Sequence, residues 1–144
     1  LPVFESNPLR LEIIPAPENV AEKMKIMPGD PVIRCLRDMS DNGERTGVDV
    51  AYLDLATFRD LKIEDLEDVK GNLYKLYEEK LGVFIADVTD ILEFVIVDKE
   101  IQKICDLPLG TPLFFVTRQS RLLNKKTVEI RYEYCSAVNY RLRI

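Results

Sequence analysis

The sequence predicts an α+β domain in which an antiparallel sheet of about six strands carries helices on one side. One observation behind this is a set of short segments, rich in β-branched residues, that alternate apolar and charged side chains. Such alternation is typical of an antiparallel sheet with one covered face. The other is that one hydrophobic pattern and one turn signature recur at an offset of 81 residues. With 144 residues, the chain is long enough for one domain spanning residues 1–144.

The repeat relates residues 11–37 to residues 92–118. After the turn that follows, the offset becomes 82, which implies one extra residue in the second hairpin. We therefore expect two copies of one motif, an internal pseudo-duplication around a pseudo-twofold axis. The matching positions are Leu11, Glu12, Gly29, Pro31, Arg37, Val48, Val50 and Tyr52 in the first copy and Leu92, Glu93, Gly110, Pro112, Arg118, Ile130, Tyr132 and Tyr134 in the second.

Each copy is predicted to begin with a strand, at residues 9–14 and 91–97. A short helix follows. Pro17 suits a first helical position in one copy, and Asp98 can cap the helix in the other. Pro28-Gly29 and Leu109-Gly110 end these helices, and the next strand leads into a hairpin at Asp41-Asn42-Gly43 or Asn124-Lys125.

Between the copies, residues 55–70 are acidic and predicted to be irregular or in short turns. Asn72 is then expected to cap a helix that ends at Gly82. Its apolar stripe consists of Leu73, Leu76, Tyr77 and Leu81.

Composition excludes several function classes. The chain has no histidine, so Ser–His and Cys–His nucleophiles are excluded, and no catalytic residue is assigned. Cys35, Cys105 and Cys135 are widely spaced, which favours buried thiols over a disulfide or a zinc site. No metal or cofactor is expected. The net charge of −5 makes the chain by itself a poor candidate for binding duplex DNA.

The location of the protein is predicted from its apolar segments. No apolar run approaches the roughly 20 residues that cross a bilayer, and no secretion signal is recognisable. We therefore expect a cytoplasmic protein that does not contact a membrane.

A series of motifs resembles a known family. These are Leu-Glu-Ile-Ile-Pro-Ala, Pro-Gly-Asp-Pro-Val-Ile-Arg, Tyr-Leu, Asn-Leu-Tyr-Lys-Leu, Leu-Pro-Leu-Gly-Thr-Pro-Leu, Thr-Val-Glu and Asn-Tyr-Arg, in that order. From about Leu9 onward, the chain resembles the UTRA domain of the HutC subfamily of GntR-type transcription regulators. The resemblance implies a chorismate-lyase-like fold that binds a small-molecule effector and forms a homodimer. It also implies that operator DNA is bound by an N-terminal winged-helix domain, which is absent from this chain.

The resemblance places the effector contacts on the two hairpins. Arg37 matches one arginine of the family's Arg-x-Arg stretch, whose second arginine is Met39 here. Asp49 stands where the family usually has glutamate, Glu129 matches a family glutamate, and Tyr134 matches a family tyrosine. We expect Arg37, Asp49, Glu129 and Tyr134 to converge on one concave site.

Two further features bear on this site. Arg118 is a candidate as well, because it is the counterpart of Arg37 in the duplication. Since a fork of two arginines suits phosphate, the loss of one favours a sugar, an amino acid or a carboxylated metabolite as the effector.

The same residues have other interpretations. Arg37 could be an ordinary exposed strand arginine, and Glu129, Arg131 and Glu133 could form a solvated strand face. Tyr134 could serve core packing. The second functional class is a chorismate-lyase-like enzyme, in which Arg37 with Asp49 or Glu129 would act on a carboxylated metabolite. The missing histidine and the regulator motifs favour a sensor domain over that enzyme.

Overall fold

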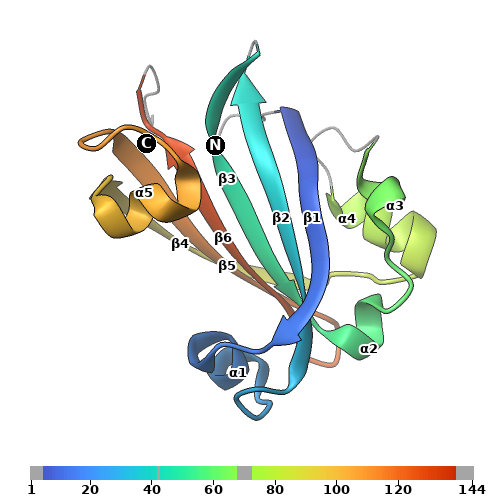
Figure 1. Ribbon diagram of the computed structural model, residues 1–144. Coiled ribbons are helices and arrows are strands. Elements are labelled where there is room, and N and C mark those ends of the chain that lie inside the picture. The colour runs from blue at the N-terminus through green and yellow to red at the C-terminus, as the bar shows by residue number, and fades with distance from the viewer. Residues whose placement is uncertain (1–4, 42, 68–72, 139–144) are drawn as a thin grey trace.

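A computed structural model describes residues 5–41, 43–67 and 73–138. Its strands form one six-stranded antiparallel sheet in the order β1-β2-β3-β6-β5-β4 (Figure 1). The α+β class and the strand number predicted from the sequence are therefore confirmed. The strands are β1 (Glu5–Pro15), β2 (Pro31–Asp41), β3 (Glu44–Leu53), β4 (Asp87–Ile96), β5 (Pro112–Arg121) and β6 (Thr127–Ser136).

The helices are short. They are α1 (Glu18–Met24), α2 (Leu55–Phe58), α3 (Ile63–Glu67), α4 (Leu73–Leu76), the π-helical turn η1 (Tyr77–Leu81) and α5 (Lys99–Cys105). The helix expected before Gly82 is thus present, with its second half π-helical, and its Asn72 cap lies outside the described residues. Asp98 caps α5 by accepting from the backbone N–H of Ile101. Pro17 stands one position earlier than predicted, immediately before α1.

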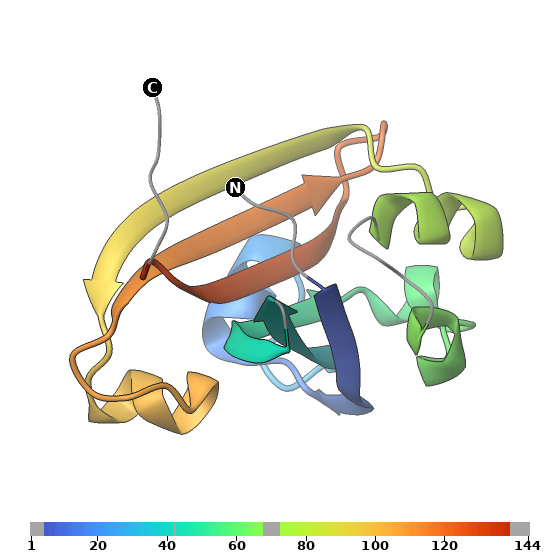
Figure 2. The same cartoon turned by 90° about the horizontal axis from the view of Figure 1, so that it is seen from above.

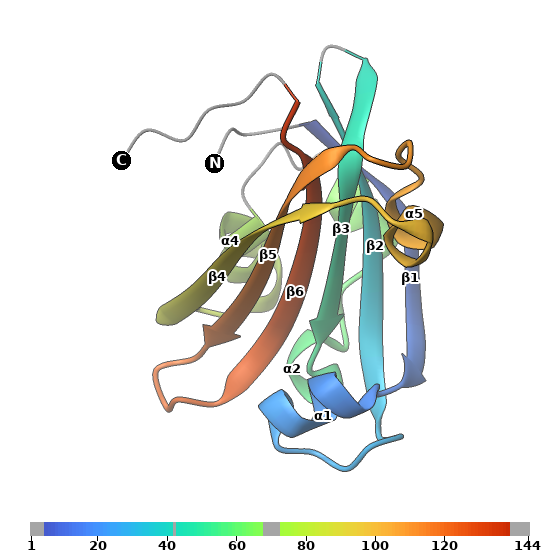
Figure 3. The same ribbon diagram turned by 90° about the vertical axis from the view of Figure 1, so that its left-hand side faces the viewer.

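Helices cover both faces of the sheet, which corrects the expectation of one covered side. α2, α3, α4 and η1 pack on the face that presents Cys35 and Leu53, here called the α4 face. α1 and α5 pack on the opposite face, the α1 face, which presents Val32 and Val50 (Figures 2 and 3). The α4 face carries charged residues between its apolar ones, so its sequence pattern is that of a solvated surface.

The internal duplication is confirmed. β1, β2 and β3 occupy the same places from one sheet edge as β4, β5 and β6 do from the other. Val50 pairs with Tyr132, its own counterpart at the offset of 82, so the pseudo-twofold axis passes between these two residues. The turn after each short helix also repeats, because Gly29 and Gly110 have φ angles of 89° and 86°.

The two hairpins differ in length as expected. The paired residues Ser40 and Arg45 enclose residues 41–44, whereas Arg121 and Thr127 enclose residues 122–126. The second hairpin therefore has one extra residue. Asn42, which was predicted to turn the first hairpin, lies outside the described residues.

All three cysteines are buried free thiols, as predicted. In the described ranges, no helix is both long and apolar enough to cross a membrane.

Candidate functional site

A layer of charged side chains lies on the α4 face, beneath the helices that connect the two copies. We call it the charged layer, and it consists of Arg37, Asp49, Asp90, Arg118, Glu129, Arg131 and Glu133. Glu129 is 0% exposed and Arg131 is 6% exposed, while Arg37 and Asp49 are also buried. The interpretation of Glu129, Arg131 and Glu133 as a solvated face is therefore wrong, as is that of Arg37 as an exposed arginine.

Strand register brings this layer together from separate strands. Arg37 on β2 pairs with Asp49 on β3, and Asp49 pairs in turn with Glu133 on β6. Arg118 on β5 pairs with Arg131 on β6. Since alternate strand residues share a face, one register places all these groups on the same side of the sheet.

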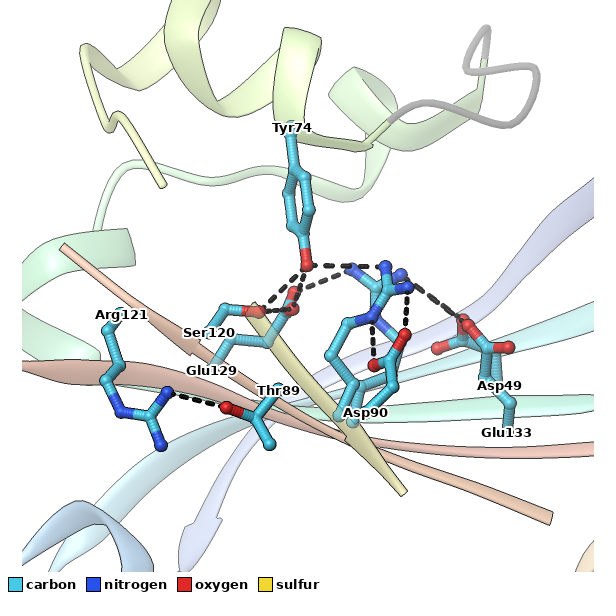
Figure 4. Close-up of polar contacts among 10 residues, drawn as sticks. Asp49, Tyr74, Thr89, Asp90, Ser120, Arg121, Glu129 and Glu133 are labelled. Carbon is cyan, nitrogen blue, oxygen red and sulfur yellow. Dashed lines mark hydrogen bonds and ion pairs between the residues drawn. The ribbon is translucent and has the colours of Figure 1, made fainter. Parts of the chain in front are cut away.

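Glu129 is the centre of a hydrogen-bond network (Figure 4). Its carboxylate accepts from Arg131 Nη2 at 2.7 Å, from the Tyr77 hydroxyl at 2.6 Å and from Ser120 Oγ at 2.7 Å. The Tyr74 hydroxyl donates at 3.2 Å. Burial by itself would raise the pKa of Glu129, but the charge of Arg131 and these hydrogen bonds bring it below its ordinary value. Glu129 is thus a buried anion with its oxygens well satisfied.

Arg118 forms the more accessible margin of the layer. Its Nε and Nη2 atoms each donate to a different oxygen of Asp90 at 2.8 Å, a bidentate pair. These hydrogen bonds hold the pKa of Asp90 below its ordinary value. The guanidinium also lies over the ring of Tyr74, 5.8 Å from its centroid. Asp90 and Tyr74 thus fix the guanidinium at the edge of the layer, where its charge can attract an anionic group.

Asp49 and Glu133 differ from Glu129 and Asp90 in that their carboxylates receive no hydrogen bond from an arginine of the layer. Asp49 Oδ1 is buried and has no hydrogen-bond partner. Asp49 Oδ2 and Glu133 Oε1 each lie 3.8 Å from Arg131 Nη1, which is too far for a hydrogen bond. Burial raises the pKa of both groups, and for Glu133 the charge of Asp49 raises it further. Figure 4 shows the two carboxylates facing the same region.

The structure brings together four of the five candidate residues, since Arg37, Asp49, Arg118 and Glu129 all lie in the charged layer. Tyr134 is the exception. It packs beside Val48 and Val50 on the α1 face, so the expectation that it converges with the others is wrong. The residue next to it in β6, Glu133, points to the α4 face instead.

Six residues at the site were not predicted from the sequence as site residues, namely Tyr74, Tyr77, Asp90, Ser120, Arg131 and Glu133. Two signals could have found some of them. Tyr74 belongs to the Asn-Leu-Tyr-Lys-Leu motif, and Ser120 is the counterpart of Met39 in the duplication. Arg131 and Glu133 alternate with Glu129 along β6 and so share its face, but whether that face is covered depends on the packing of α4.

The chemistry of the site favours binding. Cys35 lies near the layer on the same face, and burial raises its pKa to about 11, so its thiol is protonated and weakly nucleophilic at neutral pH. Among the residues that the structure describes, no group of three or more His, Cys, Asp or Glu side chains could hold a metal ion. The arrangement instead offers fixed donors and acceptors to a polar molecule.

Comparison with known proteins gives a consistent result. A family model described as the UTRA domain matches residues 3–141. The ligand-binding domain of a GntR-family transcriptional regulator from Bordetella bronchiseptica is 28% identical, with a TM-score of 0.84 over 100% of this chain and 91% of that chain. The C-terminal domain of Yurk from Bacillus subtilis is 21% identical, with a TM-score of 0.78 over 96% of this chain and 94% of that chain. The effector domain of PhnF from Mycobacterium smegmatis is 18% identical, with a TM-score of 0.76 over 96% and 84%. The last two show the fold alone.

Proposed function

We propose, given that this chain belongs to the UTRA domain family, that its charged layer is the site where it binds a small polar effector. The chain is an effector-binding regulatory domain and not an enzyme, in line with its family and with the similar regulator domain. The observation that carries the site is the burial of Arg37, Asp49, Glu129 and Arg131 on one face. Buried charges add little to stability compared with apolar side chains, so binding is the better explanation for them.

The effector we propose is a sugar, an amino acid or a carboxylated metabolite. Arginine side chains of the layer can hold an anionic group, while its carboxylates accept from hydroxyl or amino groups. Met39, which stands in place of the family's second arginine, is buried in an apolar cluster with Phe114 and Cys135. This supports an effector that does not require a fork of two arginines to hold a phosphate. We also propose that the protein belongs to the HutC subfamily.

Arg118 and Arg121 allow a matched test of the site. Both lie on β5, both pair with a carboxylate of β4 at 2.8 Å, and their side chains are 26% and 24% exposed. Only Arg118 is in the charged layer. In a thermal-shift screen of metabolites, an effector at 100 times its Kd should add about 2.7 kcal/mol of stability, which is several degrees in Tm.

Arg118→Gln should remove most of that shift, and Arg121→Gln should retain it. If both variants retain the full shift, the effector binds elsewhere. Arg118 is a better test than Arg37, because Arg37 is buried and its loss would also lower the Tm of the unliganded protein.

We further propose that the domain forms a homodimer through β4. This strand is a sheet edge, and it exposes large apolar side chains, namely Ile91, Leu92, Phe94 and Ile96. An edge strand with such side chains promotes association unless something covers it. A second copy paired along β4 would satisfy the edge hydrogen bonds and bury these side chains around a twofold axis.

The other sheet edge supplies a matched control for the dimer. Phe94 on β4 and Ile13 on β1 are counterparts in the duplication and are 67% and 64% exposed. Phe94→Glu should convert the dimer to a monomer in sedimentation or light-scattering measurements, whereas Ile13→Glu should leave the dimer intact. The reverse result would assign the interface to β1, and a monomeric unmodified protein would rule out self-association of this domain.

The proposed regulator also contains a DNA-binding part. This chain aligns with 60% of the longer PhnF chain from Mycobacterium smegmatis. We propose that operator DNA is bound in the cytoplasm by a winged-helix domain that precedes these residues in the intact protein. The net charge of −5 supports this division of roles, because phosphate contacts need positive charge.

A further inference from the structure

The two cations with described partners in the charged layer are already hydrogen-bonded to particular carboxylates. Arg118 binds Asp90 through two hydrogen bonds, and Arg131 donates to Glu129 at 2.7 Å. Asp49 and Glu133 receive no hydrogen bond from either guanidinium. Among the carboxylates of the layer, these two receive no hydrogen bond from a described residue, although the charge of Arg131 acts on both and that of Arg37 on Asp49.

Asp49 and Glu133 are also direct cross-strand neighbours on β3 and β6. Like charges placed opposite each other in a sheet are destabilising, and burial increases that cost. Asp49 Oδ1 is moreover a buried acceptor with no donor, although buried polar atoms in proteins are nearly always paired. A positively charged group with several N–H donors would relieve both problems at once.

We propose that Asp49 and Glu133 together bind the protonated amino group of the effector, which is therefore an amine-bearing metabolite such as an amino acid or an amino sugar. This inference rests on the proposed effector site. An ammonium group offers three donors around a compact charge, so it can hydrogen-bond to more than one carboxylate oxygen. Two carboxylates by themselves provide fewer oxygens than the six or more that Mg²⁺ or Ca²⁺ prefers.

Paired probes that differ only in an amino or a hydroxyl group test this assignment. The unmodified domain is titrated with amino acids and the matching 2-hydroxy acids, such as alanine and lactate, and with glucosamine and glucose. Binding is followed by thermal shift and calorimetry. We expect the amine of a binding pair to bind at least tenfold more tightly than its hydroxyl partner.

Variants then locate the amino group. Asp49→Asn and Glu133→Gln keep the side-chain shapes and should each weaken binding of the amine by tenfold or more, while changing binding of the hydroxyl partner little. Glu22→Gln is the control and should change neither, because Glu22 is exposed on α1, away from both the charged layer and β4.

Other outcomes would overturn the assignment. A panel in which no amine binds, equal binding of amine and hydroxyl partners, or variants that leave the preference intact would each do so. A Tm increase caused by Mg²⁺, Ca²⁺ or Mn²⁺ alone and lost in both variants would show a metal site instead. An effector that lacks an amine but depends on Arg118 would refute the amine subsite while leaving the proposed function in place. If no effector depends on Arg118, the proposed function fails.

Discussion

Arg131→Met is expected to lower the free energy of unfolding by about 3–5 kcal/mol, the range typical when one partner of a buried ion pair is removed. Arg131 donates to the fully buried Glu129 and lies 3.8 Å from both Asp49 and Glu133. Methionine preserves most of the length and apolar contact of the side chain. Without the guanidinium, three adjacent carboxylates would share a buried face with less positive charge. Chemical denaturation at pH 7 measures the loss.

The pH dependence of this variant distinguishes a charge effect from a packing effect. In the unmodified protein the lowered pKa of Glu129 contributes stability above its unfolded pKa, which is lost as the pH falls through the folded pKa. Without Arg131, burial is expected to raise that pKa. The variant should then gain stability as the pH falls from that raised pKa to the unfolded value of about 4.3, so its deficit shrinks over this range.

Arg121→Met supplies the control, because Arg121 forms an ion pair with Asp87 at the protein surface. Its loss should cost about 0–1 kcal/mol. A deficit for Arg131→Met as small as that of Arg121→Met, or one that does not change with pH, would mean that the carboxylates of the layer are already neutral at pH 7.

Gly47→Ala is expected to lower the free energy of unfolding by about 2–5 kcal/mol, combining backbone strain with overpacking. Gly47 has a φ angle of 158°, and an added Cβ would lie 1.8 Å from the carbonyl oxygen of Tyr134. That oxygen belongs to the backbone of β6, so no side-chain rotation relieves the clash. The β3–β6 pairing, which joins the two copies of the motif, would have to separate locally.

Gly43→Ala distinguishes the contribution of backbone strain from that of overpacking. Gly43 also has a positive φ angle, 79°, but an added Cβ there would meet nothing within 4 Å. Its substitution should cost about 1–2 kcal/mol from the backbone conformation alone. Equal losses for the two variants, measured by the same denaturation experiment, would show that β6 shifts to accept the methyl group.

The sequence by itself determined the strands, the turns and the duplication of this protein. These features depend on local signals, such as the alternation of side chains along a strand and the positive φ of Gly29 and Gly110. Because the signals occur twice at nearly the same offset, they also predict which strands are counterparts. The repeat matches Arg37 with Arg118, and both residues lie on the α4 face.

Only the tertiary structure decided which charged residues are buried. The pattern of Glu129, Arg131 and Glu133 is the same whether that strand face meets water or α4 and η1, and the helix that covers it lies far away in the chain. The hydrogen bond from Tyr77 to Glu129 spans 52 residues. Tyr134 shows a second limit of prediction from sequence. It follows Glu133 directly in β6, and this step of one residue places its side chain on the opposite face of the sheet. Whether a side chain is buried, and what covers the face of the sheet on which it lies, depends on packing between segments that are distant in sequence. Strand and turn formation depend mainly on neighbours in sequence.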